Sequence, residues 1–165
     1  YAIARPGTNR SVRAGENAPP LVLFLHGWPE SWFSWRHQLL ACARAGYVAV
    51  APDMRGYGGT TAPESTVEYN VYALAGDCLG LATALGYDRA ALVGHDHGAN
   101  LTWKLALLYP DTFSVVCCMS VPYAGYPSRG FLESLRTKYG DPKDKESALF
   151  MYMLHHNLDE VYIVL

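Results

Sequence analysis

The stretch Ala91-Leu-Val-Gly94-His95-Asp96-His97-Gly98-Ala-Asn100 decides the fold. Apolar residues lead into Gly94, a helical pattern begins after Gly98, and Asp96 stands midway between the two glycines. This arrangement is typical of a nucleophile elbow, a sharp strand-to-helix turn that raises its central side chain above the carboxyl ends of the strands. Only small residues fit two positions before and two after the centre, which accounts for both glycines. On this stretch alone, a turn with two incidental glycines remains the alternative.

Apolar runs alternate with helical patterns on both sides of the elbow. Short continuous apolar runs predict strands buried on both faces, and apolar residues at helical spacing that stop at Gly or before Pro predict helices. Strands that alternate with helices imply parallel pairing, so the fold class is α/β, with a parallel-rich sheet flanked by helices. The predicted strands are 21–25, 47–51, 90–93 and 113–121, and the predicted helices are 31–46, 71–85 and 99–109.

The pattern changes at Pro122, where we expect a domain boundary. Residues 1–121 carry the predicted buried strands. Residues 122–165 are at first rich in Pro and Gly and then helical in pattern, over 131–139 and 147–157. The second segment is therefore predicted to be mostly helical.

Both ends of the chain suggest a piece of a longer protein. The first residues already have the pattern of a strand, which starts at Tyr1. The last residues, 161–165, form an apolar run that fits a strand or a helix. We therefore expect a fold that is incomplete at both ends. In such a fold, the strand at 113–121 would be an exposed apolar edge.

Composition excludes several classes of protein. The chain has 165 residues, of which 50% are hydrophobic and 17% charged, so it is neither disordered nor fibrous. The net charge is -2 and no Lys/Arg cluster occurs, so we expect no nucleic-acid partner. No uncharged stretch is continuous enough for a transmembrane helix, and no signal-peptide pattern opens the chain, which favours a cytoplasmic location.

Neither the cysteines nor the glycine-rich loop predicts a cofactor or a metal. The cysteines at 42, 78, 117 and 118 fit no zinc-ligand spacing and are expected to be free, buried thiols of a reducing compartment. Gly56-Tyr-Gly-Gly59 lacks the Lys-Ser/Thr of a phosphate loop. We interpret it as a structural turn in which Asp53 and Arg55 pair.

The loop after the first long strand, His26-Gly-Trp-Pro-Glu30, supports the elbow. In a fold with a nucleophile elbow, one oxyanion donor comes from such a loop and the other is the N–H after the nucleophile. The predicted donors are therefore the backbone N–H groups of Trp28 and His97. Gly27 allows close approach of the backbone, and Pro29 stiffens the turn. Trp28, Pro29 and His97 are also predicted to contact substrate.

Three blocks together resemble the epoxide hydrolase branch of the α/β-hydrolase superfamily. They are residues 26–38, residues 53–60 and the elbow Gly-His-Asp-His-Gly at 94–98. The resemblance implies Asp96 as nucleophile, Trp28 and His97 as oxyanion donors, and a cis peptide at Trp28-Pro29. It also implies that residues 1–121 belong to the hydrolase core and 122–165 to the start of a helical cap, and that no cofactor is needed.

An aspartate at the elbow points to substrates other than esters and peptides. A carboxylate that attacks an acyl carbon would form an anhydride, whereas attack on a saturated carbon gives an alkyl-enzyme ester that water can hydrolyse. Epoxide opening also needs an acid, which family members supply from cap tyrosines. Tyr152 is the candidate here, with a packing role as its alternative, and Tyr123 is a further candidate for substrate contact.

The predicted function is hydrolysis of an epoxide to a vicinal diol, with the epoxide and water as the partners. A hydrolytic dehalogenase of the haloalkane or fluoroacetate type is one alternative, and a non-catalytic member of the fold that binds a small molecule is another. Neither the acid nor the histidine of the family's catalytic triad is recognised in this chain. His97, His155 and His156 are not at positions that fit the triad histidine. We therefore expect this chain to be alkylated once at Asp96 rather than to turn over.

Overall fold

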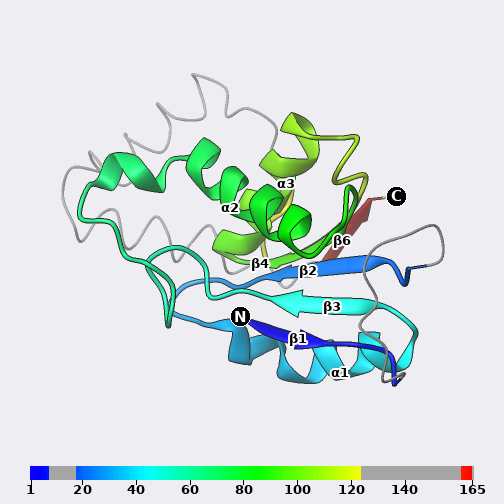
Figure 1. Cartoon of the computed structure of the whole chain (residues 1–165). Helices are drawn as coiled ribbons and strands as arrows, with labels where there is room; N and C mark the ends of the chain where they lie inside the picture. The colour runs from blue at the N-terminus through cyan, green and yellow to red at the C-terminus, as the bar shows by residue number, and fades with distance from the viewer. Residues whose placement is uncertain (8–17, 124–160, 165) are drawn as a thin grey trace.

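One mixed β-sheet forms the centre of the molecule (Figure 1). The computed structural model describes residues 1–7 and 18–123 in full and the backbone of 161–164. In these ranges the strand order is β1-β3-β2-β4-β5-β6. β2, β3, β4 and β5 pair in parallel, whereas β1 and β6 are antiparallel to their neighbours. The strands are β1 (Ala2–Ala4), β2 (Leu21–Leu25), β3 (Val48–Ala51), β4 (Ala91–His95), β5 (Val115–Met119) and β6 (Val161–Val164).

Helices cover both faces of the sheet, as the parallel pairing requires. Figure 1 shows α2 and α3 on one face and α1 on the other. The α-helices are α1 (Arg36–Arg44), α2 (Val71–Ala84) and α3 (His97–Leu108), and short 3-10 helices η1 (Trp32–Trp35) and η2 (Thr66–Tyr69) precede the first two. A large apolar cluster lies between the sheet and α2 and α3, and a smaller one lies under α1. The predicted α/β class is confirmed.

Local signals set the ends of α2. The side chain of Asn70 accepts hydrogen bonds from the backbone N–H groups of Tyr72 and Ala73, which is the geometry of an N-cap. Gly86 follows the helix with a φ of 85°, a left-handed conformation that glycine adopts at little cost. α1 ends in the same way at Gly46, which has a φ of 93°. Both C-terminal glycines were predicted from the sequence.

Three predictions about the elements need correction or completion. The segment 31–46 is not one helix, because η1 precedes α1. The strand at 113–121 is not an exposed edge, because β6 pairs with β5 through Val116 to Met119. The terminal apolar run is a strand rather than a helix. The predicted cap from residue 122 lies almost entirely at 124–160, outside the described residues, so the domain boundary stays a prediction.

All four cysteines are free thiols, as predicted, but only Cys78 and Cys118 are buried. Burial raises the pKa of each of these two thiols to about 12. Cys42 and Cys117 are partly buried, and desolvation raises their pKa values as well.

We expect Cys78 and Cys118 to resist iodoacetamide in the native chain at neutral pH. Only the thiolate reacts, and a pKa near 12 leaves a vanishing thiolate fraction. Unfolded thiols ionise near their usual pKa, so stability should fall as pH rises above about 9, where the unfolded chain loses these protons first. Mass spectrometry of labelled peptides, with and without urea, measures the protection. Equal labelling of Cys78 in both conditions would contradict it.

No helix in the described ranges is long and apolar enough to cross a bilayer.

Candidate active site

Asp96 occupies the turn between β4 and α3. Its φ of 55° and ψ of −119° are unusual for a residue other than glycine and are the mark of a strained elbow. The residue is 5% exposed. A Cβ on Gly94 would lie 2.5 Å from the Gly98 carbonyl oxygen, and a Cβ on Gly98 would overlap the Leu25 carbonyl. The steric reason predicted for both glycines is thus confirmed.

The loop after β2 brings a backbone donor to this carboxylate. The Trp28 N–H donates a hydrogen bond of 2.9 Å to Asp96 Oδ1, although 68 residues separate the two. β2 and β4 are neighbouring parallel strands in which Leu25 is paired with Gly94. The carboxyl ends of the two strands therefore lie side by side at the same edge of the sheet. The Trp28-Pro29 peptide is cis, as the resemblance implied.

Gly27 allows the loop to pack closely against Asp96. A Cβ at this position would come within 2.6 Å of Asp96 Cβ and within 2.7 Å of Oδ1. Any larger residue would therefore push Trp28 away from the carboxylate. His97 is the first residue of α3, so its backbone N–H also lies next to Asp96. Trp28 and His97 thus stay the predicted donors for the developing charge.

Glu30 and His95 form a link that the sequence reasoning missed. Glu30 Oε2 accepts a hydrogen bond of 2.9 Å from the Gly27 N–H and lies 3.2 Å from His95 Nδ1. One carboxylate oxygen therefore joins the donor loop to the residue before Asp96. The sequence places the two 65 residues apart, and only the pairing of β2 with β4 brings them together.

The glycine-rich loop at 53–60 is a structural turn, but its predicted ion pair is wrong. Asp53 is buried and accepts from the Trp32 N–H at 3.0 Å and the Gly59 N–H at 3.3 Å. Arg55 instead forms a bidentate ion pair with Asp77 on α2. Its Nη2 donates to Oδ1 at 2.7 Å and its Nε donates to Oδ2 at 2.8 Å. A buried carboxylate is better placed to satisfy nearby backbone N–H groups, here one in its own loop and one in η1, and the partly exposed guanidinium reaches α2.

We expect Asp53→Ala to lower the free energy of unfolding by about 2 kcal/mol, because two backbone donors lose their acceptor. Asp53→Asn should recover part of the loss, since its amide oxygen accepts one of the two bonds. The exposed Asp111→Ala serves as the matched control and should change stability little. Urea denaturation followed by fluorescence measures all three. An Asp53→Ala chain as stable as the control would refute the bridging role.

Tyr57 lies beside the site, on the same loop. Its ring packs edge-on against that of His26, with centroids 4.9 Å apart. Burial raises the pKa of the Tyr57 phenol, and the negative charge of Asp96 adds to the rise. The group is therefore a neutral hydroxyl at ordinary pH, close enough to Asp96 for the charge of that carboxylate to affect its pKa. No sequence pattern indicates this placement of Tyr57.

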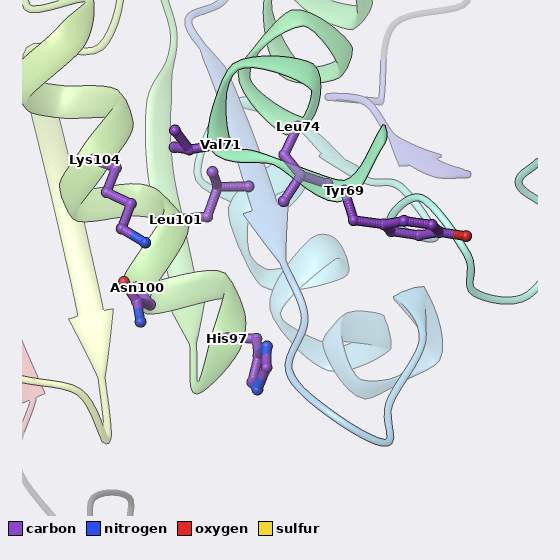
Figure 2. Close-up of a pocket in the computed structure, with 7 residues that line it drawn as sticks. All are labelled: Tyr69, Val71, Leu74, His97, Asn100, Leu101 and Lys104. Atoms are coloured by element: carbon purple, nitrogen blue, oxygen red, sulfur yellow. The ribbon is translucent and has the colours of Figure 1, made fainter. Parts of the chain in front are cut away.

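A groove of about 140 Å³ flanks the elbow on the side of α2 and α3 (Figure 2). His97, Asn100 and Lys104 contribute polar groups from α3, and Tyr69 stands opposite at the end of η2. Apolar side chains complete the lining: Val71, Leu74 and Leu101. The exposed His97 side chain therefore lines the groove directly next to Asp96 in the chain.

The other predicted site residues either have side chains exposed at the surface or lie outside the described ranges. Tyr123 is 53% exposed and packs on Trp103 of α3, with ring centroids 5.3 Å apart. The Trp28 side chain is half-exposed, and Pro29 is exposed. Their contacts with substrate stay predictions. Tyr152, the candidate acid, lies outside the described residues. Within the described part of the chain, no group of three or more His, Cys, Asp or Glu side chains could hold a metal ion.

Curated relatives with this sequence pattern are epoxide hydrolases. The chain is 44% identical over 140 residues to "Epoxide hydrolase 2" of Siraitia grosvenorii and 42% identical over 132 residues to "Epoxide hydrolase A" of Mycobacterium tuberculosis. These matches include 84% and 80% of the chain. The chain spans only 44% and 41% of the length of these relatives.

Solved structures agree with the fold. The crystal structure of epoxide hydrolase A from Mycobacterium thermoresistibile matches 78% of the chain at a TM-score of 0.68 and 45% identity. An epoxide hydrolase from Vigna radiata matches 84% of it at a TM-score of 0.70 and 42% identity. Each match covers 40% of the solved chain. The family model for the alpha/beta hydrolase fold matches residues 20–150. Because that match runs from the start of β2 through the elbow and beyond β5, the chain belongs to the α/β hydrolase fold family.

Proposed function

We propose that this chain carries the nucleophilic half of an epoxide hydrolase, which converts an epoxide and water to a vicinal diol through an ester on Asp96. The observation that carries the proposal is the 2.9 Å hydrogen bond from the Trp28 N–H to Asp96 Oδ1. This bond is made to Oδ1, and we assign the attack on the substrate to the other carboxylate oxygen, Oδ2. The names of the relatives support the choice of epoxide as substrate.

In the first step, a lone pair of Asp96 Oδ2 forms a bond to one epoxide carbon while the bond from that carbon to the ring oxygen breaks. The ring oxygen stays attached to the neighbouring carbon and takes a proton from an acid, for which Tyr152 is the candidate. The product is a hydroxyalkyl ester of Asp96. Its carbonyl oxygen is Oδ1, already held by Trp28.

In the second step, water loses a proton to a base and its oxygen adds to Asp96 Cγ. Negative charge then develops on Oδ1, where the N–H groups of Trp28 and His97 stabilise it. The bond from Cγ to the ester oxygen breaks, and the diol leaves with the proton returned from the base. The second proton of the water passes from the new carboxyl group to the acid of the first step, which restores both the carboxylate and that acid. We assign the base to none of His97, His155 and His156, so we expect a long-lived ester in this chain.

Intact-protein mass spectrometry after incubation with 1,2-epoxyhexane tests the proposal. An epoxide opens without losing an atom, so the chain should gain the full mass of the epoxide, once, on the peptide that contains Asp96. 1-Bromohexane is the matched probe for the dehalogenase alternative. It would add only the alkyl group and release bromide.

Two results would overturn the assignment. Alkylation by 1-bromohexane with no reaction of the epoxide would favour a dehalogenase. No adduct with either probe would favour a binding protein built on the hydrolase fold.

A further inference from the structure

The buried His26 ring is held between two backbone groups. It is 1% exposed. The Met54 N–H donates to Nε2 at 2.9 Å, and Nδ1 lies 2.8 Å from the Gly27 carbonyl oxygen. A ring nitrogen that accepts an N–H bond carries no proton, and a carbonyl oxygen cannot donate one. The two partners therefore define the neutral tautomer, with its proton on Nδ1, donating to Gly27.

The Gly27 carbonyl and the Trp28 N–H belong to the same peptide unit. The carbonyl oxygen accepts from His26 Nδ1 at 2.8 Å and from the Glu30 N–H at 3.2 Å, while the N–H donates to Asp96 Oδ1 at 2.9 Å. Hydrogen bonds in series polarise one another, by an estimated 10–30% per bond. A donor on the Gly27 carbonyl thus makes the Trp28 N–H a stronger donor. Because the peptide unit is planar, a hydrogen bond that fixes the direction of the carbonyl also fixes the direction of the N–H.

We propose that His26 is a positioning residue that aims and polarises the Trp28 N–H as the donor to the charge on Asp96. Only the expected effect of His26 on the reaction rates rests on the proposed function, because the hydrogen bonds of its ring do not depend on the reaction. Met54 and the Tyr57 ring fix the plane of the imidazole, and Asp53 anchors the loop that carries both. The loop at 53–60 therefore acts on Asp96 through His26.

This arrangement predicts opposite effects on the two chemical steps. Alkylation removes negative charge from the carboxylate, so a weaker donor at Oδ1 leaves that step unchanged or slightly faster. Hydrolysis of the ester places negative charge on Oδ1, so a weaker donor slows it. A residue that merely supports the fold would slow both steps together.

Two substitutions separate these roles. His26→Asn keeps an N–H donor at the position of Nδ1 and loses the acceptor for Met54. His26→Gln keeps an acceptor at the position of Nε2 and loses the donor to Gly27. In His26→Gln, we expect alkylation by 1,2-epoxyhexane at the native rate and an ester that lasts about tenfold longer in mildly alkaline buffer, less than the 10²–10³ of a donor removed outright. In His26→Asn, the ester lifetime should return toward the native value.

NMR gives a readout that does not depend on the reaction. The Trp28 amide proton should lie downfield in the native chain and in His26→Asn, and move upfield in His26→Gln. If the native chain is not alkylated, the proposed function fails while this shift still tests the positioning role. Equal Trp28 shifts and equal ester lifetimes in both variants would overturn the inference.

A measurement on the native chain covers the case in which His26→Gln does not fold. The nitrogen shifts of the His26 ring report its tautomer directly. A proton on Nδ1 is the expected result. A proton on Nε2 would overturn the inference, because the ring would then have nothing to donate to Gly27.

Discussion

Replacement of Asp96 by Asn should reduce alkylation of the chain by 1,2-epoxyhexane by about 10⁴-fold or more, a loss of the size seen when an enzyme loses its nucleophile. The amide is neutral and far less nucleophilic than the carboxylate. Its oxygen still accepts the Trp28 N–H, and Asn tolerates the positive φ of this position at least as well as Asp. The fold should therefore survive the change, and only the chemistry should be lost.

Asp88→Asn is the matched control for this experiment, because Asp88 is an exposed aspartate away from the elbow. It should be alkylated at the native rate, again on the peptide that contains Asp96. Peptide mapping by mass spectrometry measures both variants. Persistent labelling of Asp96→Asn at the native rate would place the reactive group elsewhere and end the case for Asp96 as nucleophile.

The second large effect concerns stability. Gly98→Ala should lower the free energy of unfolding by about 3 kcal/mol or more, because its Cβ would overlap the Leu25 carbonyl and lie 2.8 Å from the His26 carbonyl oxygen. Both contacts are backbone atoms of the strand and loop that carry Trp28, so no side chain can rotate away. The donor and the nucleophile would have to separate to make room.

Gly80→Ala provides a control of opposite sign. Gly80 lies inside α2, and a Cβ there would meet nothing within 4 Å. Alanine in a helix interior is favoured over glycine by about 0.5–1 kcal/mol, so this variant should be more stable than the native chain. Chemical denaturation of the two variants side by side decides the matter. A Gly98→Ala variant that loses no more free energy of unfolding than a typical surface variant would contradict the predicted clash with the Leu25 and His26 carbonyls.

The elbow could be predicted from the sequence because part of its constraints is local. A Cβ on Gly94 would clash with Gly98 and Ala99, within a few residues of Asp96, whereas a Cβ on Gly98 would clash with the end of β2, which the spacing of the glycines does not reveal. The ends of α1 and α2 were predictable for the same reason, since Gly46 and Gly86 take left-handed conformations directly after each helix. Family resemblance added the cis peptide, for which the residues themselves gave no sign.

The contacts that were missed join distant parts of the chain. Arg55 was expected to pair with its neighbour Asp53, but α2 presents Asp77 to it. Glu30 meets His95 only because their strands are adjacent. Short-range patterns cannot rank such partners, because the choice depends on which groups the folded backbone leaves within reach.

The pairing of Leu25 with Gly94 has a consequence for protein engineering. The loop that carries Trp28 and the turn that carries Asp96 follow directly after β2 and β4. The register of these two hydrogen-bonded strands therefore sets the distance between the Trp28 N–H and Asp96. The helices α1 and α2 on the crossover that connects these strands do not set that distance, whereas the crossover's loop at 53–60 holds His26 beside the donor. Libraries that vary the exposed faces of these helices should therefore leave the donor-to-nucleophile distance intact, whereas a shift of β4 by one residue would destroy it.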